Sequence, residues 1–333
     1  MAQAALRLLQ NAPGEFFVDE TCIDCATCRN IAPSVFAYSS DAGRSVVARQ
    51  PSGDGEALRA AMALVACPTS SIGSANKVFA REASRAFPEP VPGTDGVYYC
   101  GFASESSYGA SSWLIVRPEG NVLVDSPRAA RPLIDGIAAL GGVRTMFLTH
   151  RDDVADHEAF RRRFGCERVL YRSDVSHGTR DVERQLEGND PVRLADDLLV
   201  IPVPGHTRGS AALLYRDQVL FTGDHLWGEE NESTTTGGRR ARSGHTCEIA
   251  CWLEQSILCV LTTPFGVPVE PDVNKILATV SGPTIPFARS SAGPGALLER
   301  SLTIAVADPR LDTSGTSGIA AAMAAANGAG SST

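Results

Sequence analysis

Four cysteines constrain the first part of the chain more than any other feature. Cys22, Cys25 and Cys28 follow a C-x2-C-x2-C spacing, and Cys67 stands before a proline at the end of an amphipathic segment, residues 56–65. Three thiols at this spacing can converge on one point in a tight loop, and the proline ends the helix that carries the fourth. The pattern predicts one cubane iron–sulfur cluster. A zinc knuckle or a disulfide is the alternative.

Residues 16 to about 76 resemble a single-cluster bacterial-type ferredoxin, in the segments VDETCIDCATCRNIAPSVF and ACPTSSIG. The resemblance implies an α+β ferredoxin-like domain over residues 14–80 that binds one 4Fe-4S cluster through all four cysteines. Cys25 stands where some relatives carry aspartate and hold a three-iron cluster. A single set of ligands implies one-electron chemistry or a structural role.

Composition excludes several classes of protein. The net charge of −8 and the pI of 5.3 argue against nucleic acid or an anionic membrane as the main partner. No run approaches 18 apolar residues, so no membrane span is expected. Nine cysteines in this arrangement do not look like a disulfide framework. The first ten residues lack a secretory signal pattern. We therefore expect a cytoplasmic protein, with a plastid or other organelle as the alternative.

A second domain is predicted after a linker. Residues 81–96 contain three prolines and two glycines, which is a linker composition. From residue 97 the sequence alternates strand, turn and helix patterns up to about residue 227. The predicted elements are a hairpin over 112–116 and 121–124, a helix over 128–140, a strand over 145–149, a helix over 154–164, a strand ending before His206, and a hairpin ending at Asp224.

Polar side chains follow three of these predicted strands. The segment TMFLTHRDDVADHEAF, residues 145–160, places two imidazoles and three carboxylates within eight residues of a strand end: His150, Asp152, Asp153, Asp156 and His157. His206 and Asp224 follow two later strands. Loops at one end of a sheet build the site in layered α/β folds. We therefore predict a site for a divalent cation such as zinc, iron or manganese.

The order of these segments resembles the metallo-β-lactamase superfamily over residues 97–227: Asp125 in LVDSP, the loop after TMFLT, GHTRGS and FTGDHL. The resemblance implies an αββα sandwich that binds one or two metals. It implies that His150 and His206 bind the first metal, that Asp156 and His157 bind the second, and that Asp224 bridges them. Asp156 would also orient the nucleophilic water, whose pKa the metal lowers.

Two departures from that family stand out. The usual H-x-H-x-D-H loop reads H-R-D-D-V-A-D-H here, which is two residues longer and has Asp152 at the position of the second histidine. Asp152 could bind the first metal and favour iron or manganese; alternatively, Asp152 and Asp153 support the ligands or are solvated. No late histidine matches the family's last ligand. A sandwich that is incomplete at the C-terminus is one interpretation of this difference.

Residues 228–333 are predicted to be irregular and partly disordered. They are rich in polar and turn-forming residues and end in a low-complexity tail. Within them, the segment 247–261 has a helical pattern. His245, with Cys247 and Cys251, offers a replacement for the missing ligand; a flexible histidine and two ordinary thiols is the plainer interpretation.

Three functions follow as hypotheses. The first is a metal-dependent hydrolase that acts on a small thioester, ester or amide. This substrate class is what a resemblance to glyoxalase II-like members of the metallo-β-lactamase superfamily implies. The second is an iron-dependent oxidoreductase that takes electrons from the cluster, because a plain hydrolase has no need of an electron carrier. The third is an electron-transfer or sensing protein with a degenerate sandwich. The expected partners are a small-molecule substrate and, for the redox functions, an electron-donor or acceptor protein.

Overall fold

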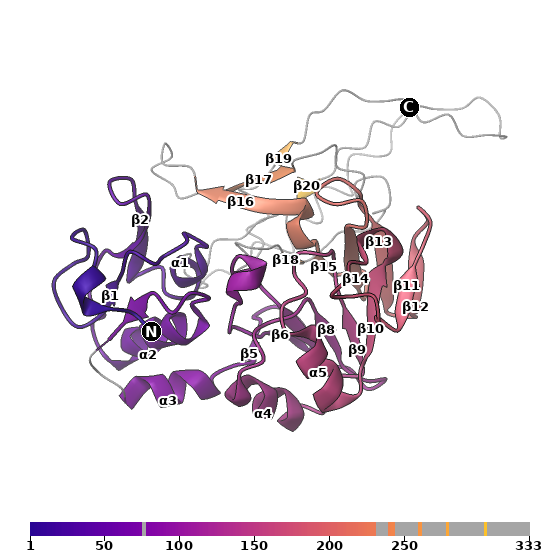
Figure 1. Cartoon of the computed structure of the whole chain (residues 1–333), viewed down its shortest axis with the longest axis horizontal. Coiled ribbons are helices and arrows are strands. Elements are labelled where there is room, and N and C mark those ends of the chain that lie inside the picture. Colours follow the sequence, from indigo (N-terminus) through magenta and orange to yellow (C-terminus); the bar gives the residue numbers. More distant parts are fainter. Residues whose placement is uncertain (75–77, 231–238, 244–258, 262–277, 280–302, 305–333) are drawn as a thin grey trace, which may run out of the picture.

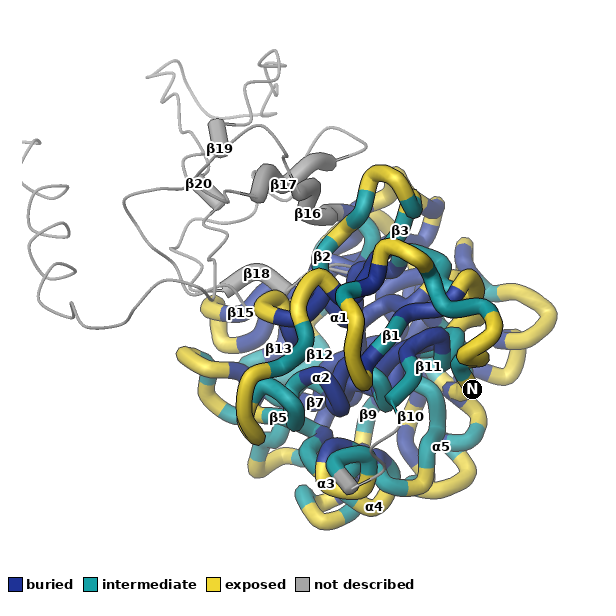
Figure 2. Tube along the Cα trace, turned by 90° about the vertical axis from the view of Figure 1, so that its left-hand side faces the viewer, coloured by how far each residue is buried: buried dark blue, intermediate teal, exposed yellow. Residues whose placement is uncertain are grey.

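The computed structural model describes residues 1–74, 78–230, 239–243, 259–261, 278–279 and 303–304. A small N-terminal domain lies beside a larger sandwich of two β-sheets (Figure 1). The predicted fold class, a ferredoxin-type domain followed by a two-sheet α/β sandwich, is confirmed for this part of the chain. Buried residues lie along the strands and α2, and exposed residues lie mainly on the connecting loops (Figure 2).

The N-terminal domain consists of two small antiparallel pairs and two helices. Strand β1 pairs with β4, and β2 pairs with β3. Helix α2 has two acidic residues in its first turn, which favours its N-terminus, and it ends where Cys67 and Pro68 follow. The bounds are η1 (Ala4–Leu6), β1 (Phe17–Val18), α1 (Thr27–Ile31), β2 (Phe36–Ser39), β3 (Arg44–Val47), α2 (Asp54–Ala66) and β4 (Ile72–Gly73).

Between the two domains the structure differs from the predicted linker over 81–96. Helix α3 (Val78–Arg85) occupies its start, and strand β5 (Glu89–Pro90) joins the larger sheet. The helix forms because Phe79 and Ala83 lie four residues apart on one face and pack against the core. This apolar pair begins before the proline-rich stretch, so composition over 81–96 alone did not reveal it.

The larger sheet of the sandwich has seven strands in the order β11-β10-β9-β8-β7-β6-β5. The pairs from β5 to β8 are antiparallel, whereas the pairs from β8 to β11 are parallel. Strand β8 therefore has one neighbour of each kind. The predicted hairpin and helices are confirmed. The bounds are β6 (Val97–Tyr99), β7 (Trp113–Ile115), β8 (Val122–Val124), α4 (Arg131–Ala139), β9 (Thr145–Phe147), α5 (His157–Phe164), β10 (Glu167–Tyr171) and β11 (Arg184–Leu186).

The second sheet has five strands in the order β12-β13-β14-β15-β18. The predicted hairpin of β14 and β15 is confirmed. Strand β18 pairs in parallel with β15, so the helix predicted over 247–261 is wrong for its last three residues, and residues 247–258 lie outside the described part. The bounds are β12 (Val192–Ala195), β13 (Leu198–Pro202), β14 (Ala211–Tyr215), β15 (Val219–Phe221) and β18 (Cys259–Leu261).

Alternating side chains of the larger sheet build two separate layers of core. Phe147 faces the second sheet and packs in a cluster with Trp113 and Phe221, whereas Met146 and Leu148 face α4 and α5. The helix-side layer continues into the N-terminal domain, so this layer and the buried residues of that domain form one contiguous core. The continuous apolar runs of these strands, buried on both faces, thus define an α layer and two β layers.

The predicted second helical layer of an αββα sandwich lies outside the described residues, as do His245, Cys247, Cys251 and most of the predicted irregular region, 228–333. The described parts of that region form short strand pairs, namely β16 (Leu226–Glu230) with β17 (Arg239–Ser243), and β19 (Ala278–Thr279) with β20 (Thr303–Ile304). Among the described helices, none has the length and apolar character needed to cross a membrane.

Candidate metal centres

The four predicted cluster ligands lie around one cavity in the N-terminal domain. Cys22, Cys25, Cys28 and Cys67 line it together with apolar side chains such as Ile72. All four thiols are free. The loop closes tightly because Asp24 and Ala26 adopt positive φ angles of 58° and 59°, which turn the chain between the cysteines. The predicted convergence of the four sulfurs is therefore present.

The electrostatics of this cavity fit a cationic cluster. Burial raises the pKa of Cys25 to about 11, and burial likewise raises the pKa of Cys28, with neighbouring thiols adding to both effects. Backbone N–H groups point at two sulfurs: Asp24 N lies 3.5 Å from Cys22 Sγ, and Ser71 N lies 3.4 Å from Cys67 Sγ. Such donors stabilise cluster-bound thiolates. Iron ions would supply the positive charge that buried thiolates need.

The sandwich domain covers this cavity on the side of Cys25. Gly109 approaches so closely that a Cβ built on it would lie 2.5 Å from Cys25 Cβ and 2.9 Å from Cys25 Sγ. Its neighbour Tyr108 donates a hydrogen bond from Oη to the Ile23 carbonyl at 2.8 Å, and Thr27 Oγ1 donates to the Gly109 carbonyl at 3.4 Å. The cysteine loop is therefore closed by a segment of the other domain.

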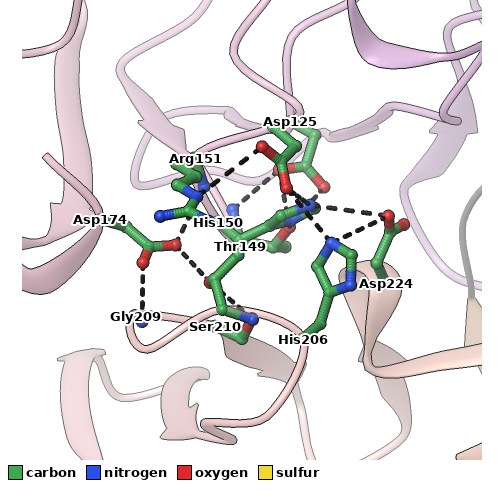
Figure 3. Close-up of polar contacts among 11 residues, drawn as sticks. Asp125, Thr149, His150, Arg151, Asp174, His206, Gly209, Ser210 and Asp224 are labelled. Carbon is green, nitrogen blue, oxygen red and sulfur yellow. Dashed lines mark hydrogen bonds and ion pairs between the residues drawn. The ribbon is translucent and has the colours of Figure 1, made fainter. Parts of the chain in front are cut away.

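The second centre lies where three strands of the sandwich end. His150 follows β9, His206 follows β13, and Asp224 lies in the short helix η4 (Gly223–His225) after β15. Figure 3 shows the two imidazoles and Asp224 turned toward one another. Asp224 Oδ2 lies 3.6 Å from His150 Nε2 and 3.5 Å from His206 Nε2. The structure thus brings together these three predicted ligands.

Asp152 and Asp153 also lie at this centre, one of them exposed and the other buried. Asp152 Oδ2 lies 3.2 Å from His206 Nε2 and 3.8 Å from His150 Nε2, on the exposed side. Asp153 is buried, and its Oδ2 has no hydrogen-bond partner among the described residues. Ligand atoms of two sets, each including His150, lie within 4.8 Å of one another: His150, Asp152 and His206, and His150, Asp153 and Asp224.

His150 has one nitrogen directed to this centre. Its Nδ1 lies 3.0 Å from Thr149 Oγ1, and that hydroxyl lies 3.0 Å from both carboxylate oxygens of Asp125. Because the single hydroxyl proton is donated to the carboxylate, the network assigns the imidazole proton to Nδ1. Nε2 is therefore the nitrogen that can exchange its proton for a metal, and it is buried and has no hydrogen-bond partner in the described chain. This orientation is the one a metal-binding histidine needs.

The charges at this centre favour a cation. Burial alone would lower the pKa of His150, but the neighbouring carboxylates outweigh burial and raise it to about 9. Burial raises the pKa of Asp125 to about 7, and burial also raises the pKa of Asp153, with the other carboxylates adding to both shifts. Buried carboxylates that lie close together repel one another. A divalent cation would relieve that repulsion in place of the imidazole proton.

The predicted second pair of ligands, Asp156 and His157, does not lie at this centre. Asp156 accepts a hydrogen bond from the Ala129 N–H at 2.8 Å, and His157 Nδ1 lies 2.9 Å from Arg168 Nη1. Both residues lie at the start of helix α5, where Asp156 is the N-cap and His157 is the first helical residue. The role of Asp156 in orienting a nucleophile stays a prediction.

The sequence interpretation missed Asp174, which holds two loops of the site together. This buried carboxylate accepts hydrogen bonds from Arg151 N at 3.0 Å, from Gly209 N at 2.8 Å and from the Thr207 hydroxyl. It therefore ties the loop that carries His150 to the loop that carries His206 (Figure 3). Asp174 follows strand β10, so its position after a fourth strand end was the available signal.

Gly223 sets the position of Asp224 through a close approach. Its φ is +51°, and a Cβ at this residue would lie 2.5 Å from Thr149 Oγ1. The loop after β15 can therefore contact Thr149, the residue that orients His150. A glycine is needed here for both reasons.

Residues 18–74 match the family described as the 4Fe-4S single cluster domain of ferredoxin I. This finding confirms the predicted ferredoxin domain and its iron–sulfur cluster. Among curated proteins, none matches the chain.

Solved structures of metallo-β-lactamases are similar to parts of the chain. One is GOB-18 from Elizabethkingia meningoseptica, with 21% identity over 39% of this chain and 58% of that one, at a TM-score of 0.30. Another is a metallo-β-lactamase from Cronobacter sakazakii with a HARLDQ motif. It has 19% identity over 47% of this chain and 64% of that one, at a TM-score of 0.31. The class B3 di-zinc metallo-β-lactamase LRA-12 from an Alaskan soil metagenome has 16% identity over 54% of this chain and 80% of that one, at a TM-score of 0.37. The chain spans less than two thirds of the first two structures.

We predict that Gly109→Ala destabilises the iron–sulfur cluster. The new methyl group clashes with Cys25, which adds about 1–3 kcal/mol of strain to the cost of a side chain at positive φ. Iron and sulfide content should fall, and the visible absorbance of the cluster should decay faster in air. Gly93→Ala is the matched control, because Gly93 also has a positive φ, +73°, but no atom within 4 Å of the added Cβ. Equal cluster stability in the two variants would contradict the closure of the cavity by Gly109.

We predict that Asp174→Asn lowers the free energy of unfolding by about 3 kcal/mol, because an amide loses the charge and turns an NH2 group toward one of three donors. Urea unfolding followed by circular dichroism measures the loss. Asp181→Asn is the control, since the Asp181 side chain is 78% exposed. A loss of the same size in both variants would show that Asp174 does not hold the loops.

Proposed function

We propose that the strand-end centre binds one divalent cation and that the chain is a metal-dependent hydrolase with an attached iron–sulfur domain. The observation that carries this proposal is the pair of buried atoms without hydrogen-bond partners in the described chain, His150 Nε2 and Asp153 Oδ2. Buried polar atoms in native proteins are nearly always satisfied, so such a pair at one centre indicates a missing ligand.

The residues at this centre fit a single cation better than two. Both candidate ligand sets depend on His150, whose other nitrogen contacts Thr149. His150, His206 and Asp224 would hold the cation, with Asp152 or Asp153 as a further carboxylate. Two imidazoles with several carboxylates suit zinc, iron or manganese. When bound, the cation would polarise a substrate carbonyl and lower the pKa of a water toward neutrality.

The open side of the centre determines where a substrate would enter. The side chains of Asp152 and His206 are 53% and 37% exposed, whereas His150 is buried. A substrate would therefore approach past Asp152, and this carboxylate is placed to accept a proton from a water on that side. Asp152 thus takes the place beside the nucleophilic water that the sequence interpretation gave to Asp156. Thr149 and Asp125 would keep the imidazole of His150 oriented.

The proposed substrate is a small thioester, ester or amide. This class rests on the resemblance of the LVDSP, GHTRGS and FTGDHL segments to glyoxalase II-like members of the metallo-β-lactamase superfamily. We also propose a reducing compartment, the cytoplasm, because the cysteines whose side chains the structure describes are free thiols, namely Cys22, Cys25, Cys28, Cys67, Cys100 and Cys166.

A second candidate function, an oxidoreductase fed by the cluster, is favoured by a hydrogen-bonded route between the two centres. Ala103 N–H donates to the carbonyl of Ala66, which precedes Cys67. Its neighbour Phe102 accepts a hydrogen bond from the Arg128 N–H at 2.9 Å. Two residues before Arg128, the N–H of residue 126 donates to the Asp153 carbonyl at 3.0 Å. A protein electron donor or acceptor would be the partner in this case.

We predict that His206→Ala weakens binding of the second-site cation by more than about 100-fold, because loss of an outer-shell partner alone costs about 10- to 100-fold. Metal analysis after anaerobic purification should show that the cluster iron is unchanged and that the additional metal is lost. Thioester hydrolysis should be lost as well. His177→Ala is the control, because His177 is an exposed loop residue. Full retention of the additional metal in His206→Ala would refute the ligand assignment.

The identity of the additional metal separates the two candidate functions. Zinc together with thioester hydrolysis supports the hydrolase. Iron beyond the four of the cluster, with a signal in electron paramagnetic resonance that changes when the cluster is reduced, supports the oxidoreductase. No additional metal in the wild-type protein would contradict both.

A further inference from the structure

A cavity outside the two metal centres lies between the two sheets of the sandwich. It has a volume of about 420 Å³ and opens where β10 and β11 of the larger sheet end beside the end of β13. This volume is within the range of about 300–1,000 Å³ that is typical of small-molecule sites. Its lining includes Tyr171, Arg172, Leu186, Pro202, Arg208 and Ser210.

Two polar groups of this lining have no partner in the described part of the chain. Tyr171 is only 5% exposed, and its hydroxyl is buried without a hydrogen bond. The guanidinium of Arg208 forms no hydrogen bond or ion pair there, in contrast to Arg172, which pairs with Glu187 at 2.7 Å. A buried hydroxyl without a partner is costly, so a ligand that accepts its hydrogen bond would be stabilised.

The chemistry of the lining selects an anion with an apolar part. Arg208 offers several N–H donors with a full positive charge, and a guanidinium binds carboxylate or phosphate oxygens in pairs. The Tyr171 hydroxyl is a further donor. Leu186 and Pro202 provide an apolar wall on the two sheets. Among the charged residues of the lining, Glu187 pairs with Arg172, so the exposed Arg208 carries the charge that is not paired within the lining. Asp190 lies close enough to act on the Tyr171 hydroxyl, so Arg208 is the donor on which anion binding depends.

The wall of the cavity is fixed by the same loop that carries His206. Ser210 Oγ lies 2.8 Å from Thr207 Oγ1 and accepts a hydrogen bond from the Thr207 N–H at 3.0 Å. Asp174 in turn accepts hydrogen bonds from this loop (Figure 3). The loop that presents Arg208 is therefore held in place before any ligand arrives, which lowers the entropic cost of binding.

We propose that this cavity binds a small organic oxyanion, a carboxylate or a phosphate ester, whose charged end meets Arg208 and the Tyr171 hydroxyl and whose apolar part lies against Leu186 and Pro202. The site is separate from the candidate cation centre. Its binding does not depend on metal at that centre or on the proposed hydrolase activity.

Isothermal titration calorimetry of the full chain with benzoate, phenyl phosphate and the neutral benzamide tests this site. We expect one or both anions to bind and benzamide not to bind. Arg208→Gln should weaken anion binding about tenfold or more, and Tyr171→Phe about fivefold, because each removes one donor but leaves the cavity wall in place. Preference for benzoate or for phenyl phosphate identifies the class of oxyanion.

Arg131→Gln is the matched control, because the Arg131 side chain is 92% exposed on α4 and does not line the cavity. It should bind the anions with unchanged affinity. The proposal is overturned if neither anion binds, if benzamide binds as tightly as the anions, or if Arg208→Gln and Arg131→Gln have equal affinities. Metal content at the strand-end centre, measured in the same variants, should not change.

Discussion

The burial of negative charge at three strand ends is the constraint on which the sandwich site depends. Asp125 and Asp153 are buried, and Asp224 lies beside them. Carboxylates removed from water are stable only when paired or hydrogen-bonded. In the metal-free chain, the imidazole of His150 supplies the positive charge, and its pKa near 9 reflects that arrangement. The surrounding contacts, such as Thr149 with Asp125, make the same arrangement suitable for a cation.

The sequence predicted the proximity of those candidate ligands that follow directly from strand ends. His150, His206 and Asp224 each come after an apolar strand, and strand direction alone brings them to one edge. Asp156 and His157 lie instead at the start of helix α5, where their contacts are with Ala129 and Arg168. Local spacing defines the strand ends, but the helix start decides which way the next side chains point.

Other features could not be predicted because they are contacts between distant segments. Asp174 looked like any polar residue after a strand, and only the tertiary structure shows that it binds both ligand loops. The contact of Gly109 with Cys25 joins residues 84 positions apart across two domains. Helix α3 was missed since its apolar pair, Phe79 and Ala83, lies partly before the proline-rich stretch that suggested a linker. Composition describes a segment, whereas these features depend on its partners.

The shared core gives the iron–sulfur domain a structural consequence for the sandwich. Core residues run without a break from α2, which ends beside Cys67, to α4 on the outer face of the larger sheet. Metal binding by a site that exists only in the folded chain contributes to folding free energy. Without iron, burial would instead keep the thiols of Cys25 and Cys28 protonated, as their raised pKa values indicate. Cluster assembly therefore stabilises the loop beneath Gly109 and, through the Ala103–Ala66 hydrogen bond, the segment that leads to Asp153. A hydrolase with no need of electrons would still have a physical reason to keep the cluster.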